Sequence, residues 1–97
     1  MAGSHQIERF RFKNIEGVAV NDLTVEFNSE DVKTRDPGPF DKAVTTGKTI
    51  KLEIGDVKSD DIIKITFERN GEFNIRRWQW TLDGNPKGDW KLGPPAG

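Results

Sequence analysis

Apolar and polar residues alternate along most of this chain, and this period of two is the feature that most limits its fold. In segment 7–13, for example, Phe10 and Phe12 share one parity, and the positions between and beside them are basic. Such alternation is typical of a β-strand with one face in a core and the other in water. No segment repeats apolar residues at helical spacing over the roughly 11 residues that an amphipathic helix needs. The sequence therefore predicts an all-β protein.

The alternation recurs in short segments that are separated by turn residues. The predicted strands are 7–13, 18–27, 42–46, 49–54, 62–68, 73–82 and 89–92. Asn21 and Asp22 indicate a kink or bulge, and segments 55–61 and 83–88 have the composition of turns. Asn70-Gly71 is the dipeptide preferred in tight type I′ hairpins, so strand 62–68 is expected to pair with strand 73–82.

The number and spacing of these strands predict the architecture. About six to eight short strands, with turn signals every 8 to 12 residues or so, favour a small antiparallel β-sandwich, immunoglobulin-like or jelly-roll-like. A small closed β-barrel is the alternative. With 97 residues the chain has room for a single domain, expected at 6–92. Residues 1–5 resemble an expression-tag remnant, and the Gly- and Pro-rich residues 93–97 resemble a tail or linker.

Charge and composition limit the classes of partner. Lys and Arg total 15 and Asp and Glu total 16, so the formal net charge of −1 gives no field of either sign. We therefore do not expect a general nucleic-acid or anionic-membrane binder, and no apolar run approaches the roughly 20 residues that span a bilayer. The chain is expected to be soluble, and without Cys it has no disulfide framework or thiolate site. None of these features indicates a compartment.

Catalytic and metal-binding residue sets are missing from the sequence. His5 is the one His, Cys and Tyr are absent, and the few Ser residues have no nearby base. Asp83, Asn85 and Asp89 supply oxygens of the kind that Ca²⁺ takes, but Pro86 and the lack of a closing Glu do not fit an EF-hand loop. We therefore expect no enzymatic activity, no cofactor and no bound metal.

Three tryptophans form the most distinctive cluster in the sequence. Trp78 and Trp80 lie two positions apart, so on a regular strand their indoles share one face, about 6 to 7 Å apart. If they are exposed, they offer a stacking platform for sugars, formed by Trp78, Trp80, Trp90, Arg77, Asp83, Asn85 and Asp89. If a bulge near Arg76 and Arg77 resets the register, both indoles pack in the core instead. A chain with 33% hydrophobic residues favours the core interpretation.

A basic stripe is a further candidate site. It would consist of Arg9, Arg11, Lys13, Lys64 and Arg69 if the strands that carry them are neighbours. Glutamates are interleaved through the strands, at Glu8, Glu26, Glu53 and Glu68, and ordinary cross-strand acid-base pairs explain both sets. Nucleic acid is therefore not the expected partner.

The remaining candidate is a loop or a sheet edge that binds another protein. Segment 28–41 is the longest stretch without apolar periodicity, and long loops are often functional. Its candidate contact residues are Glu30, Asp31, Arg35, Asp36 and Phe40. The sequence thus favours a non-enzymatic interaction or assembly module that binds another protein, or a second copy, through loops or a sheet edge. A carbohydrate-binding module with a Trp platform is the alternative.

Overall fold

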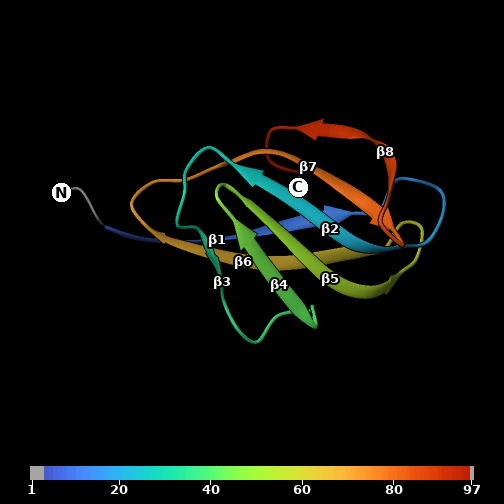
Figure 1. Ribbon diagram of the computed structural model, residues 1–97, viewed down its shortest axis with the longest axis horizontal. Coiled ribbons are helices and arrows are strands. Elements are labelled where there is room, and N and C mark those ends of the chain that lie inside the picture. The colour runs from blue at the N-terminus through green and yellow to red at the C-terminus, as the bar shows by residue number, and fades with distance from the viewer. Residues whose placement is uncertain (1–3, 97) are drawn as a thin grey trace.

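The computed structural model describes residues 4–96. In this part of the chain the strands are β1 (His5–Lys13), β2 (Val20–Phe27), β3 (Lys33–Thr34), β4 (Lys42–Thr46), β5 (Thr49–Val57), β6 (Ile62–Asn70), β7 (Ile75–Leu82) and β8 (Asn85–Leu92) (Figure 1). They form two antiparallel sheets. The small sheet has the order β1-β6-β3, and the large sheet has the order β4-β5-β2-β7-β8.

The two sheets pack together around one core, which confirms the predicted β-sandwich in place of a closed barrel. The immunoglobulin-like and jelly-roll-like labels remain predictions. Residues 4–96 include no helix that is long and apolar enough to cross a membrane.

Aromatic rings join the two sheets at the centre of the core. Phe12 of β1 meets Trp78 of β7 edge to face, with ring centroids 5.3 Å apart. Phe27 of β2 meets Phe67 of β6 in a similar geometry at 4.9 Å. Each pair links the small sheet to the large one, so oriented aromatic contacts add to the burial of apolar area.

A β-bulge in β7 sets the direction of the side chains that follow it. Glu26 of β2 lies opposite Arg77, but the next residue, Phe27, lies opposite Ile75. Arg76 is therefore an extra residue in β7, and it resets the inward and outward alternation of the strand. Of the two registers considered for this strand, the one with a bulge near Arg76 and Arg77 is therefore the one observed.

The bulge turns both tryptophans of β7 into the core. Trp80 is fully buried and Trp78 is 6% exposed. Their rings meet edge to face at 6.3 Å, and the Trp80 indole N–H donates to the carbonyl oxygen of Lys13 at 3.1 Å. Because the indole N–H has an acceptor at the end of β1, Trp80 fixes the large sheet to the small one without an unsatisfied donor.

Asn14 is a fully buried polar residue at the end of β1. Its side-chain amide donates to the carbonyl oxygens of Val18 at 2.8 Å and Val57 at 3.2 Å. Its Oδ1 accepts from the backbone N–H of Glu16, and its own backbone N–H donates to Asp61. Asn14 therefore ties the turn after β1 to the end of β5 and to the turn before β6, with its polar groups paired.

The tight hairpin predicted at Asn70-Gly71 does not form, because β6 and β7 belong to different sheets. At this end of β6 both edges are occupied, by His5 of β1 and by Lys33 of β3. The chain therefore has no free edge along which to return, and it crosses to the large sheet, where Phe73 is buried. The prediction was wrong because the neighbours of a strand, and not a dipeptide, decide whether an edge is free.

The two-residue hairpin of this fold lies between β7 and β8, at Asp83 and Gly84. Both residues have positive φ, 50° and 82°, as a type I′ turn requires. Leu82 and Asn85 pair directly across it. The predicted turn at 83–88 is thus limited to its first two residues, and the edge strand predicted at 89–92 begins earlier.

The kink predicted at Asn21 and Asp22 coincides with a register shift between β2 and β5. The extra residues lie on β5, which continues to Val57 through Gly55, whose φ is +103°. Glycine adopts this conformation without the steric cost that a Cβ brings. The predicted turn at 55–61 was therefore too long at its beginning.

Both ends of the domain are held by hydrogen bonds. β1 begins at His5, inside the segment interpreted as a tag remnant, and His5 Nδ1 lies 2.9 Å from Asn70 Oδ1. The rest of that segment, except Ser4, lies outside the described residues, as does residue 97. Near the other end, the Gly93 N–H donates to the carbonyl oxygen of Arg76 at 2.7 Å, so the tail begins attached to the bulge.

Phe67→Ala should lower the free energy of unfolding by about 3 to 5 kcal/mol, because it opens a cavity between the sheets. Chemical denaturation measures the loss. Val44→Ala is the control, since Val44 is 43% exposed on β4, and it should cost less than about 1 kcal/mol. Equal effects of the two substitutions would contradict the assignment of Phe67 to the core.

Asn14→Ala should cost about 2 to 4 kcal/mol, because it leaves the buried carbonyl of Val57 and the part-buried carbonyl of Val18 without their donor. The same denaturation experiment measures it, with exposed Asn85→Ala as the control. A near-neutral Asn14→Ala would mean that water reaches these carbonyls.

Candidate functional site

The side chains predicted to form a carbohydrate platform do not share one exposed surface. Trp78 and Trp80 are buried, as the core interpretation requires. Trp90 of β8 is half-buried, and the Arg77 guanidinium lies over its ring, 4.1 Å from the centroid. Arg77 also pairs with Glu26, at 2.6 Å between Nε and Oε1. The three indoles of the chain therefore do not provide the two exposed rings that a sugar platform needs.

The polar residues of the same predicted site are spread along the last hairpin. Asp83 Oδ1 accepts from the Asn21 side-chain amide at 2.9 Å, which ties the hairpin turn to β2. Asn85 and Asp89 are exposed on β8. In residues 4–96, no group of three or more His, Asp and Glu side chains is placed to hold a metal ion.

Loop 28–41, predicted to bind a partner, contains a short strand that the sequence pattern did not indicate. Lys33 and Thr34 form β3 and pair with β6. Four of the predicted contact residues are exposed, namely Glu30, Asp31, Arg35 and Asp36. Phe40, the fifth, is half-buried against the core. The loop therefore adds an edge to the small sheet and leaves its charged residues in water.

The outer face of the small sheet gathers basic side chains from all three of its strands. Residues that pair across neighbouring strands point to the same face, and the register places Arg11 directly opposite Lys64. We define the basic face as the exposed residues Arg9, Arg11, Lys13, Lys33, Arg35 and Lys64. It holds six of the 15 Lys and Arg residues of a chain whose net charge is −1. Positive charge is therefore concentrated here.

Little of this charge is neutralised locally. Glu68 is the one carboxylate at an outward position of β1, β3 and β6, and it already pairs with Arg35 at 3.0 Å. Within residues 4–96, Arg9, Arg11 and Lys64 have no ion-pair partner. Lys13 has none in that range either. The basic face thus carries an uncompensated positive potential.

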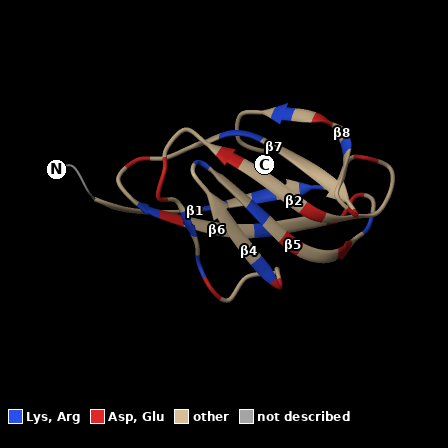
Figure 2. Cartoon of the chain, in the orientation of Figure 1, with Lys and Arg blue, Asp and Glu red and all other residues tan. Residues whose placement is uncertain are grey.

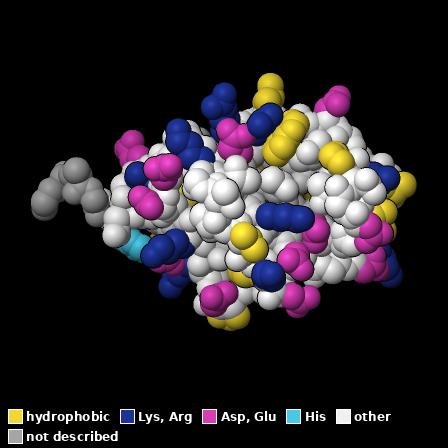
Figure 3. Space-filling model, in the orientation of Figure 1, with side chains coloured by type: hydrophobic (Ala, Val, Ile, Leu, Met, Phe, Trp, Pro, Cys, Tyr) yellow, Lys and Arg dark blue, Asp and Glu magenta, His cyan; other side chains and the backbone are white. Residues whose placement is uncertain are grey.

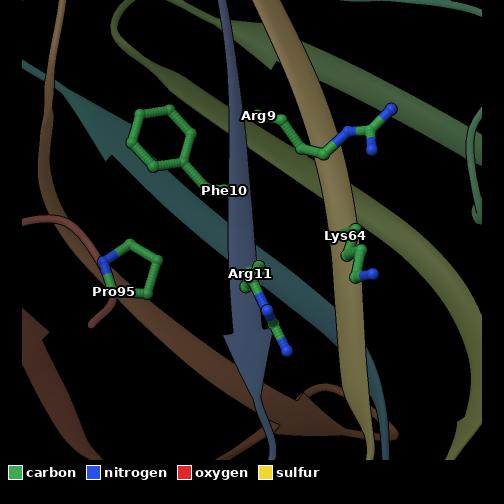
Figure 4. Close-up of a pocket in the computed structure, with 5 residues that line it drawn as sticks. All are labelled: Arg9, Phe10, Arg11, Lys64 and Pro95. Atoms are coloured by element: carbon green, nitrogen blue, oxygen red, sulfur yellow. The ribbon is translucent and has the colours of Figure 1, made fainter. Parts of the chain in front are cut away.

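The figures show how the charges are arranged. Lys and Arg positions recur along β1 in Figure 2. In the close-up of Figure 4, Arg9 and Arg11 of β1 extend to the same side as Lys64 of β6, and Phe10 extends to the other side. These four residues and Pro95 line a shallow pocket of about 300 Å³. On the side seen in Figure 3, by contrast, basic and acidic side chains are interspersed.

The expectation that interleaved glutamates neutralise a basic stripe is wrong for Glu26 and Glu53, which belong to β2 and β5 of the large sheet. Arg69, expected in the stripe, is not part of the basic face. Its guanidinium donates to two loop carbonyls, at 2.7 and 2.9 Å. Lys33 and Arg35 were missing from the predicted stripe because their place beside β6 depends on a pairing that no sequence pattern indicates.

Lys64→Glu should stabilise the domain by about 0.2 to 1 kcal/mol at low ionic strength, because it replaces a like-charge pair with Arg11 by an opposite-charge pair. Salt should reduce the gain by screening. Thermal unfolding at low and high ionic strength measures it. Lys51→Glu is the control, since Lys51 lies 3.9 Å from Asp22 and its reversal should bring no gain. A destabilised Lys64→Glu variant would contradict an uncompensated basic face.

We compared the chain with protein-family models, with curated proteins and with solved structures, and none of the three comparisons found a match. The functional proposal therefore rests on the geometry and charge of the basic face.

Proposed function

We propose that this domain is a non-enzymatic binding module whose basic face binds an acidic segment of a partner protein. The observation that carries the proposal is the placement of Arg11 directly opposite Lys64, with no carboxylate of residues 4–96 paired to either. Like charges at facing positions destabilise a sheet. Functional residues often cost stability in the free protein, and a bound acidic partner offsets that cost.

The shape of the face favours a macromolecular partner. The pocket beside Arg9, Arg11 and Lys64 is shallow, about 300 Å³, and its walls are these three exposed side chains together with half-buried Phe10 and Pro95. Small-molecule sites are usually deeper and more apolar. Charges spread over three strands instead suit a partner that makes several contacts at once, which gains specificity and association rate from electrostatic complementarity.

A protein partner fits this face better than nucleic acid. The aromatic rings of β1 and β6, at Phe10, Phe12 and Phe67, point to the core side, so the outward positions have no ring on which a base can stack. Asp31 lies beside Lys33 and Glu68 at the margin of the face. Carboxylates there repel a uniform polyanion, whereas a protein segment can place its acidic residues only where cations face them.

Charge reversal tests the proposal. Arg11→Glu should weaken binding of labelled poly-L-glutamate by about tenfold or more, because it removes one cation from the face and adds a repulsive charge. Lys51→Glu changes the net charge equally but lies on the large sheet, and it should leave the affinity nearly unchanged. Fluorescence anisotropy at low ionic strength measures both variants.

Two outcomes would overturn the proposal. Equal losses for Arg11→Glu and Lys51→Glu would mean that only the overall charge matters. Tighter binding of duplex DNA than of poly-L-glutamate, lost in Arg11→Glu, would assign the face to nucleic acid.

A further inference from the structure

The backbone directions in β6 show which of its residues face away from β1. The Asn14 N–H donates to the Asp61 carbonyl at 2.9 Å, and the Gly71 N–H donates to the Ser4 carbonyl at 2.8 Å, one bond at each end of the ladder. Backbone groups of residues two apart in a strand point to the same side. The odd-numbered residues of β6 therefore bond to β1, and the even-numbered ones, including Lys64, point to the opposite edge.

β3 covers only one end of that opposite edge. Its pairing with β6 is limited to Glu68 and Phe67, followed by a bond from the Arg35 N–H to the Thr66 carbonyl at 3.0 Å. Beyond Arg35 the chain contains Pro37 and Pro39, which have no N–H and cannot extend the ladder. In the described part of the chain, no strand pairs with this edge of β6 from residue 62 to residue 65.

A groove lies beside this edge of β6, and it extends over the outer face of the sheet to Thr66 and to Arg9 of β1. Its volume is about 400 Å³, and Pro37, Gly38 and Pro39 form one wall. Ile62 and Lys64 contribute to the other wall, and Ile62 is 42% exposed. The groove therefore borders free backbone donors and acceptors at strand spacing, which are the groups that an extended polypeptide satisfies.

The side chains beside the groove indicate the pattern of the segment that fits it. Lys64 lies on the outward side, directly opposite Arg11 of β1. The next outward residue of β1 is Arg9, which lies opposite Thr66. On the inward side stands Ile63, which is partly buried and packs against the core. A strand placed here meets cations on one face and an apolar surface on the other.

We propose, building on the function proposed above, that the acidic segment of the partner docks as an added strand on the open edge of β6. Acidic residues alternate with apolar residues in that segment. The acidic ones face the cations of the outer face, and the apolar ones face Ile63. Main-chain hydrogen bonds between β6 and the added strand fix the position of the segment along the edge. The basic face selects segments that carry acidic residues.

A second copy of this chain does not supply such a segment from its described free edges. β4 has no Asp or Glu, β8 has Asp89 alone, and β1 has Glu8 alone. A partner protein is therefore the proposed occupant.

Peptides with selectively blocked backbones test the strand. The probe is a seven-residue peptide of alternating Glu and Val, with two derivatives, one N-methylated at each Glu and the other at each Val. In an added strand one set of N–H groups faces β6 and the other faces solvent. One derivative should therefore lose about tenfold or more in affinity by calorimetric titration, and the other should bind like the parent.

Amide hydrogen exchange tests from the side of the protein whether the edge of β6 is open. In the free domain the Lys64 N–H should exchange faster than the Ile63 and Ile65 N–H groups, which face β1, and the parent peptide should slow it. A Lys64 amide already protected in the free domain would overturn the inference, because the edge would be closed.

The remaining outcomes separate this inference from the proposed function. If both N-methylated derivatives bind like the parent, or if only poly-L-glutamate binds, strand addition is wrong and the basic face keeps its proposed role. If neither probe binds, both proposals fail. If the domain self-associates with rising concentration and the parent peptide reverses this association, the occupant of the edge is a second copy of the chain. That result would overturn the assignment to a partner protein.

Discussion

Trp78 and Trp80 both face the core because Arg76 is an extra residue in β7. If β7 ran through Arg76 in regular register, without the bulge, the alternation that buries Ile75 would turn both indoles toward water. The core would then lose its two largest side chains, in a domain small enough that each buried aromatic matters. Trp80 also donates to the Lys13 carbonyl, so the same bulge fixes the large sheet against the end of β1.

Because the rings are buried between the sheets, the outward positions of the small sheet are free to carry charge. The result is an imbalance, with Arg11 facing Lys64 across two strands and Glu68 already paired with Arg35. The open edge of β6 lies beside these cations, since β3 ends after two residues and Pro37 follows shortly after it. Charge and an edge without a paired strand thus occur together, and the proposed acidic segment would satisfy both.

Prediction from the sequence succeeded where structure depends on neighbours along the chain. The period of two indicated the strands, β4 has the predicted bounds, and a bulge near Arg76 was one of the two registers that the sequence allowed for the tryptophans. It failed where structure depends on distant residues. Asn70-Gly71 has the composition of a hairpin turn, but His5 and Lys33 already flank the end of β6. β3 is too short to show any alternation.

The sequence by itself determined the all-β class, the inward positions of the regularly alternating strands and the absence of cysteine chemistry, because each of these follows from local periodicity or composition. Only the tertiary structure decided which strands are neighbours. That choice separated Glu26 and Glu53 from the basic residues of β1, and it brought Arg11 to Lys64. The physical reason is that the period of two along a strand sets the face to which each side chain points. Which side chains of neighbouring strands lie beside it on that face depends on strand pairing.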